Sequence, residues 1–225
     1  MSASLGPRLQ RAAACSFRRR PLVHRFKIRS SSSGSDTQGG ETGDATPITD
    51  FRQYLNFKKL NSSDKISSDS FEGKAVLVVN TASLCGFTPQ LGEMQAVHNR
   101  FGRSGLTVLA VPSNDFGEQE PWGEEEIREF YEVQWGVTYP ITSKVQVIGD
   151  AAHPFYKAIA STVPEDFLPV WNFGKYLLNH EGDLVGVFPS SISPCEEEVT
   201  EAILEALPAG EVWQGTEQSE DGPSQ

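Results

Sequence analysis

Residues 73–91 read GKAVLVVNTASLCGFTPQL, and this stretch decides the fold class. Ala75–Val79 is a continuous apolar run rich in β-branched residues, which is typical of a strand buried on both faces. After a loop that contains Cys85, apolar residues recur at the spacing of a helix: Leu91, Met94, Val97 and Phe101. A buried strand, a loop and a helix in this order predict the first unit of an α/β domain.

The alternation of strands and helices continues toward the C-terminus. The elements that we expect next are a strand at Leu106–Val111, a helix at Glu124–Trp135, a short strand at Val145–Ile148, a helix at His153–Thr162, a hairpin of Lys175–Leu178 with Leu184–Phe188, and a helix at Pro194–Leu207. A further hairpin is expected between residues 51 and 70. This order predicts an α/β fold with a central mixed β-sheet, mainly parallel and flanked by helices, and an N-terminal β-hairpin.

The two ends of the chain differ in composition from this region. The first 35 residues hold eight Lys and Arg side chains, eight serines and no acidic side chain. Without an apolar h-region this pattern is typical of an organellar transit peptide, and a disordered basic tail is the alternative. We expect a transit peptide and linker at residues 1–48, one domain at 49–207 and a flexible acidic tail at 208–225. The mitochondrion is the expected destination, with the plastid as the alternative.

Charge and hydropathy exclude several classes of partner. The formal net charge is −11, so the residues after the basic leader carry −19 once its eight positive charges are subtracted. Such an acidic domain repels nucleic acid and anionic lipid. No apolar run approaches the roughly 20 residues that a membrane-spanning helix needs. We therefore expect neither nucleic-acid binding nor stable membrane association.

The chain has three cysteines, and Cys15 falls in the leader. Cys85 and Cys195 remain, and no Cys-x-x-Cys pair is present for zinc or dithiol chemistry. Cys85 lies beyond the carboxyl end of a strand and close to a helix N-terminus, where the helix dipole favours the nucleophilic thiolate. A buried structural cysteine is the alternative at this position. Any thiol chemistry therefore depends on individual cysteines.

Three residues farther along the chain offer hydrogen-bond donors that do not titrate, namely Gln119, Trp171 and Asn172. Donors of this kind stabilise a thiolate and the negative charge that develops on a leaving oxygen. Taken singly, each residue also fits a loop, a core or a turn. Their value as site residues depends on whether they meet Cys85 in space.

Four blocks of sequence resemble the glutathione peroxidase family. They are residues 73–88, 109–121, 152–156 and 171–177. The blocks occur in the family's order, and the resemblance extends from about Tyr54 to Leu207. It implies a thioredoxin-like fold and an active-site tetrad at Cys85, Gln119, Trp171 and Asn172.

The resemblance implies a thiol-dependent peroxidase that protects against oxidative stress. Cys85 is then expected to reduce hydrogen peroxide or an organic or lipid hydroperoxide and to become a sulfenic acid. Glutathione or thioredoxin is the expected reductant, and no cofactor or metal is expected. The segment between Thr162 and Trp171 is as short as in the family's monomeric members, so a monomer is expected.

The sequence departs from the family in the helix where many members carry a resolving cysteine, because residues 127–135 contain none. Sulfenic acid at Cys85 is then resolved by an external thiol or by Cys195, for which an inert thiol is the alternative. The family's arginine after the last strand is missing at Val187–Pro189, which argues against efficient capture of anionic glutathione. A peroxide sensor that passes oxidation from Cys85 to a partner protein is a second function, and an inactive scaffold is a third.

Overall fold

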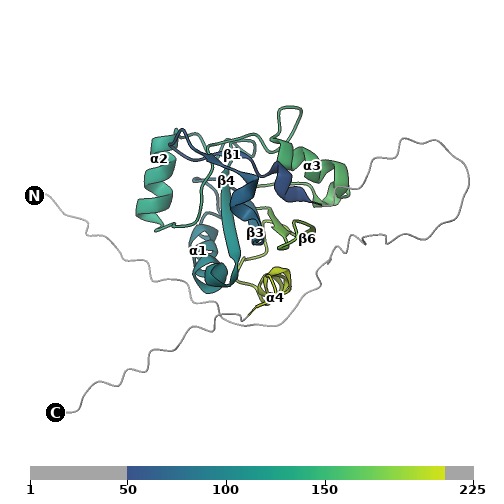
Figure 1. The fold of residues 1–225 in the computed structure, drawn as a ribbon. Helices are drawn as coiled ribbons and strands as arrows, with labels where there is room; N and C mark the ends of the chain where they lie inside the picture. Colours follow the sequence, from purple (N-terminus) through teal and green to yellow (C-terminus); the bar gives the residue numbers. More distant parts are fainter. Residues whose placement is uncertain (1–49, 211–225) are drawn as a thin grey trace, which may run out of the picture.

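The computed structural model describes residues 50–210, which are coloured in Figure 1. The expected leader at residues 1–48 and most of the expected tail lie outside the described residues. At the centre is a four-stranded sheet in the order β4-β3-β5-β6. Its strands are β3 (Ala75–Thr81), β4 (Leu106–Pro112), β5 (Lys175–Leu178) and β6 (Leu184–Phe188). The predicted mixed sheet is confirmed, but only the β3–β4 pairing is parallel, since β5 pairs antiparallel with both β3 and β6.

Helices cover both faces of this sheet (Figure 1). On one face α1 (Gln90–Phe101) and α4 (Glu197–Ala206) share a core with Leu77 and Val79 of β3. On the other face α3 (Pro154–Thr162) shares a second core with Val76 and Val78. Successive side chains of a strand point to opposite faces, so β3 contributes to both cores and is buried along its whole length. Each fully buried Val or Leu contributes about 1.5–3 kcal/mol to stability.

The remaining elements are short. They are η1 (Phe51–Tyr54), β1 (Phe57–Lys58), β2 (Lys65–Ile66), η2 (Ser68–Phe71), η3 (Gly102–Ser104), α2 (Glu124–Arg128), η4 (Glu129–Gln134) and η5 (Glu165–Phe167). Strands β1 and β2 pair antiparallel and confirm the predicted N-terminal hairpin. No helix between residues 50 and 210 is long and apolar enough to cross a membrane.

The predicted helix at Glu124–Trp135 is correct in position but not in geometry. It is α-helical only in α2, and η4 continues it as a π-helix. The wider turn is visible in the bond from the Trp135 amide to the Phe130 carbonyl, which spans five residues. The π-helix is rare and occurs mostly as a single turn inside an α-helix, so an apolar repeat is interpreted by default as an α-helix.

Two other expectations on secondary structure were wrong. Val145–Ile148 forms no strand, because the amide of Val147 donates to the carboxylate of Asp115 instead of to a neighbouring strand. The last helix begins at Glu197 rather than at Pro194. The residues before it form a turn, in which the Cys195 amide donates to Oγ of Ser193 at 3.0 Å.

Candidate active site

Cys85 lies in the loop between β3 and α1, and its residue is only 8% exposed. Thr88 closes this loop: its Oγ1 accepts from the Cys85 amide at 3.1 Å and lies 3.0 Å from the carbonyl oxygen of Ala82. The Phe87 amide donates to Sγ of Cys85 at 3.4 Å. Cys85 is a free cysteine, as the sequence argument requires.

Gln119 and Asn172 are in direct contact although 53 positions separate them in the sequence. Nδ2 of Asn172 donates to Oε1 of Gln119 at 2.9 Å and to the carbonyl oxygen of Phe116 at 3.3 Å. Asn172 is fully buried. The loop after β4 reaches Asn172 through two consecutive left-handed residues, Gly117 (φ 63°) and Glu118 (φ 52°). This tight turn brings the glutamine amide back toward the sheet.

Trp171 lies over the same turn and keeps 38% of its surface exposed. Its ring centroid is 6.0 Å from that of Phe116. A Cβ placed on Gly117 would lie 3.3 Å from Cη2 of Trp171, so the indole packs directly on that glycine. Only glycine combines the positive φ with this close approach.

The loop of Cys85 is joined to this group through the backbone. The amide of Leu84 donates to the carbonyl oxygen of Gln119 at 3.0 Å. The structure therefore bonds Gln119 to Asn172, packs Trp171 on the turn before Gln119, and ties the residue before Cys85 to Gln119. The catalytic roles of the four residues stay predictions.

The turn that presents Trp171 and Asn172 is strained. Phe173 has φ 67°, a left-handed conformation that costs a residue with a side chain roughly 1–2 kcal/mol. Asn80, at the end of β3, holds this turn: its Nδ2 donates to the carbonyl oxygen of Trp171 at 3.0 Å, and its own carbonyl accepts from the Phe173 amide at 2.6 Å. No function was expected for Asn80 from the sequence. A polar residue at the end of an otherwise apolar strand was the available signal.

Glu120 is a second residue for which no function was expected from the sequence. It is fully buried beside Gln119, and its Oε2 accepts from Oγ of Ser83 at 2.9 Å and from the Tyr131 hydroxyl at 3.3 Å. Burial raises the pKa of this carboxyl, while the bond from Ser83 opposes the shift. Glu120 thus connects the loop of Cys85 with the π-helix η4.

Cys195 lies beside α1 rather than in this group. Its Sγ is 3.6 Å from the carbonyl oxygen of Glu93. Within residues 50–210, no cluster of three or more His, Cys, Asp or Glu side chains has the arrangement of a metal site. A resolving function for Cys195 stays a prediction.

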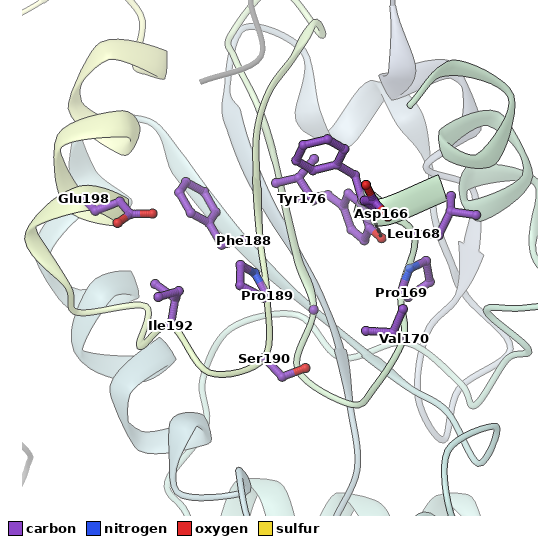
Figure 2. A pocket seen from close by; sticks show the side chains of 13 residues that line it. Asp166, Leu168, Pro169, Val170, Tyr176, Phe188, Pro189, Ser190, Ile192 and Glu198 are labelled. Carbon is purple, nitrogen blue, oxygen red and sulfur yellow. Dashed lines mark hydrogen bonds between the residues drawn. The ribbon is translucent and has the colours of Figure 1, made fainter. Parts of the chain in front are cut away.

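An apolar pocket of about 260 Å³ adjoins the turn that carries Trp171 (Figure 2). Pro169 and Val170 form one side, Phe188 and Ile192 the other, and Ser190 lies between them. Two acidic residues are the charged members of its lining, Asp166 and Glu198. Val170 and Gly174, which also line it, lie on either side of the turn at residues 171–173. The pocket therefore borders the turn at residues 171–173.

Residues 53–160 match the family model of glutathione peroxidase. A hydroperoxy fatty acid reductase of Synechocystis sp. is 46% identical over 134 residues, which cover 56% of this chain and 79% of the relative. This chain belongs to the glutathione peroxidase family. The residues matched by the glutathione peroxidase model include Cys85 and Gln119 and end before Trp171. Family membership makes the chain a glutathione peroxidase-like enzyme.

Two further comparisons agree with the glutathione peroxidase assignment. The glutathione peroxidase-like peroxiredoxin HYR1 of Saccharomyces cerevisiae is 38% identical over 160 residues, covering 65% of this chain and 98% of the relative. The crystal structure of Trgpx in apo form has a TM-score of 0.56 at 31% identity and covers 70% of this chain and 95% of its own. A thioredoxin family protein from Chlorobium tepidum, at 17% identity, has a TM-score of 0.52 with coverage of 72% and 98%. The predicted thioredoxin-like fold is thereby confirmed.

Proposed function

We propose that this enzyme reduces hydroperoxides with a thiol and that Cys85 is the residue that attacks the peroxide. The observation that carries the proposal is the junction between the Cys85 loop and the Gln119–Asn172 pair. One backbone bond of 3.0 Å links Leu84 to Gln119, and one side-chain bond of 2.9 Å links Gln119 to Asn172. A nucleophile and a set of neutral donors are thus held by the same short chain of contacts.

The reaction balances with two equivalents of an external thiol. The thiolate of Cys85 attacks one oxygen of ROOH, the O–O bond breaks, and the alkoxide leaves and takes up a proton to give ROH. Cys85 is then a sulfenic acid. A first thiol forms a mixed disulfide with it and releases water, and a second thiol displaces Cys85 as a thiolate. The sum is ROOH plus two thiols giving ROH, water and one disulfide.

The neutral donors Gln119 and Trp171 suit the step in which the O–O bond breaks. Negative charge then moves onto the leaving oxygen, and preorganised N–H groups stabilise such charge strongly in a site of low polarity. The carboxamide of Gln119 and the indole of Trp171 are neutral donors at all physiological pH values. The side-chain amide of Asn172 donates to Oε1 of Gln119 and so orients the Gln119 side chain.

We propose glutathione or thioredoxin as the reductant. The acidic residues Asp166 and Glu198 line the pocket next to Trp171, and they disfavour an anionic thiol such as glutathione at that place. This local repulsion acts on anionic glutathione and does not apply in the same way to the thiol of a protein such as thioredoxin. A monomeric enzyme fits the short segment before Trp171.

The pocket supports organic hydroperoxides, including those of lipids, as substrates beside hydrogen peroxide. Its walls are mostly apolar, and it borders the turn that carries Trp171, so it suits the carbon chain of ROOH. We also propose import into the mitochondrion, with the plastid as the alternative, from the basic, serine-rich first 35 residues.

A peroxide sensor is the second candidate function. The helix of residues 124–134 contains no cysteine, and Cys85 is the free cysteine of the described residues. Without an internal resolving thiol, the sulfenic acid persists until a partner protein's thiol attacks it. Such a sensor passes on its oxidation and does not turn over with a small thiol.

The test is consumption of hydrogen peroxide by the full chain, with glutathione or with thioredoxin and its reductase, beside Cys85→Ser. Steady turnover that disappears in Cys85→Ser is the expected result. One equivalent of peroxide consumed per enzyme, without turnover, would favour the sensor. Equal rates in the two proteins would overturn both proposals.

A further inference from the structure

Lys175 is a buried cation at the first position of β5. Its residue is 0% exposed, and it pairs with Val79 of β3 and with Phe188 of β6. Val79 and Phe188 belong to the apolar core beneath α1 and α4. No carboxylate of the described residues lies within ion-pair distance of its ammonium. Removing a charge from water without a paired opposite charge is costly, so a lysine here needs an explanation.

The ammonium is bonded instead to backbone carbonyl groups of the site. Nζ of Lys175 donates to the carbonyl oxygen of Phe173 at 2.8 Å and to that of Pro189 at 3.4 Å. Phe173 is the left-handed residue of the turn that carries Trp171 and Asn172. A strained residue persists only where its surroundings hold it in several directions. Asn80 holds the amide side of this residue, and Lys175 holds its carbonyl side.

The same contact reaches the helix that follows Cys85. Pro189 precedes Ser190, whose carbonyl oxygen accepts from Nε2 of Gln90 at 2.7 Å. Gln90 is the first residue of α1. One ammonium group therefore connects the turn of Trp171 to the segment after β6, and Gln90 connects that segment to the helix beside the Cys85 loop.

We propose that Lys175 is a positioning residue of the peroxidase site, whose ammonium holds the strained turn that presents Trp171 and Asn172 to Gln119. The expected effect of Lys175 on catalytic turnover rests on the proposed function. Its expected effect on the conformation of residues 171–173 does not. Hydrogen bonds from a charged donor are roughly twice as strong as neutral ones, so the turn depends on the charge of this amine.

The charge is poised to change near neutral pH. Burial lowers the pKa of Lys175 to about 7, and the carboxylate of Glu93 on α1 opposes that shift. The groups that face it from β3 and β6, Val79 and Phe188, are apolar and carry no charge. As pH rises through this value, the ammonium becomes an amine and the turn loses its charged donor.

The first test uses Lys175→Met, whose unbranched side chain is one atom shorter than that of lysine and carries no charge. At pH 6 we expect kcat of this variant to be roughly 10- to 100-fold below that of the native enzyme, because small displacements of positioning groups have effects of that size. The ratio of native to variant kcat should fall between pH 6 and pH 8, with little change in KM for hydrogen peroxide. A folded variant with native kcat and an unchanged pH profile would overturn the proposal.

A second measurement does not need turnover. In Cys85→Ser, the NMR signals of the Trp171 indole and the Phe173 amide should shift with pH around an inflection near 7. Glu93→Gln, which keeps an acceptor for Ser193, should move that inflection to lower pH, because Glu93 raises the pKa of Lys175. This arm applies even if Lys175→Met does not fold. An inflection that is absent, or unmoved by Glu93→Gln, would refute the proposal. An inflection in Cys85→Ser, together with no peroxide turnover by the native protein, would support positioning by Lys175 and refute the proposed function.

Discussion

Nδ2 of Asn172 lies 2.9 Å from Oε1 of Gln119, across 53 positions of the sequence. Gln119 follows β4 and Asn172 precedes β5, and β3 separates these two strands in the sheet. The bond therefore joins two loops over the end of β3, close to where the Cys85 loop begins. Because Oε1 accepts from Asn172, the donor Nε2 of Gln119 is directed away from that residue.

Replacing the donor of this pair should reduce activity. Asn172→Asp places a buried carboxylate against two acceptors, Oε1 of Gln119 and the carbonyl oxygen of Phe116. We expect kcat/KM for hydrogen peroxide to fall by about 10²- to 10³-fold, the range seen when an oriented donor of this type is lost. Asn99→Asp, the same change on the exposed side of α1, is the control and should leave kcat/KM unchanged. Native kcat/KM in Asn172→Asp would contradict the orienting contact.

Gly117→Ala should separate backbone strain from contact with Trp171. Gly117 and Gly136 both have positive φ, 63° and 67°, so alanine at either position should cost roughly 1–2 kcal/mol of stability. A Cβ at Gly117 meets Trp171 at 3.3 Å, whereas one at Gly136 meets nothing within 4 Å. We expect both variants to unfold at lower temperature and only Gly117→Ala to lose activity. Equal activity losses would indicate that the indole does not depend on this contact.

The carboxyl of Glu120 should make stability depend on pH. Burial raises its pKa, so the folded protein binds this proton more tightly than the unfolded chain does. The stabilisation that protonated Glu120 contributes is fully present below the ordinary glutamate pKa of about 4.3. It is lost as pH rises through the raised pKa of the folded protein. Glu120→Gln has no carboxyl to titrate at this position, so it does not lose this stabilisation. The Tm of the variant minus the Tm of the native protein should therefore rise with pH. A Tm difference that stays constant from pH 4 to pH 9 would mean that Glu120 does not titrate in this way.

The apolar pocket should affect organic hydroperoxides more than hydrogen peroxide. Val170 lines the pocket and is 73% exposed, while Val133 is 71% exposed and lies outside the pocket lining. Val170→Asp should raise KM for a long-chain neutral alkyl hydroperoxide by about tenfold, which corresponds to roughly 1.4 kcal/mol of lost binding. KM for hydrogen peroxide should not change, and Val133→Asp should change neither value. A KM for the alkyl substrate that is the same in both variants would count against binding in the pocket.

The sequence was most informative where burial alone decides structure. The apolar runs of β3 and β4 predicted both strands, and the spacing of Leu91, Met94, Val97 and Phe101 predicted α1. At Val145–Ile148 an apolar pattern led to a wrong strand. There the backbone amide of Val147 is taken by the side chain of Asp115, a partner 32 positions away. The apolar pattern of a segment does not indicate which acceptor its backbone amides bind.

The site was predicted in part for the same reason. The residues Cys85, Gln119, Trp171 and Asn172 were recognisable by motif, and the structure bonds Gln119 to Asn172 and packs Trp171 on the turn before Gln119. Asn80, Glu120 and Lys175 were missed because their importance lies in their partners. Lys175 was counted as part of a strand, and only the fold shows that its ammonium reaches the turn at Phe173.

The sheet separates two cores, and the candidate site depends on both. Cys85 and Phe173 belong to the core beneath α1 and α4, whereas Phe116, which contacts Trp171 and accepts from Asn172, belongs to the core beneath α3. A genetic screen for peroxide sensitivity should therefore recover hydrophobic substitutions on either side of the sheet, far from Cys85, in proteins that still accumulate to normal levels. Suppressors of such alleles should map to the same core as the first mutation, because a change of volume on one face is corrected only by residues that share it.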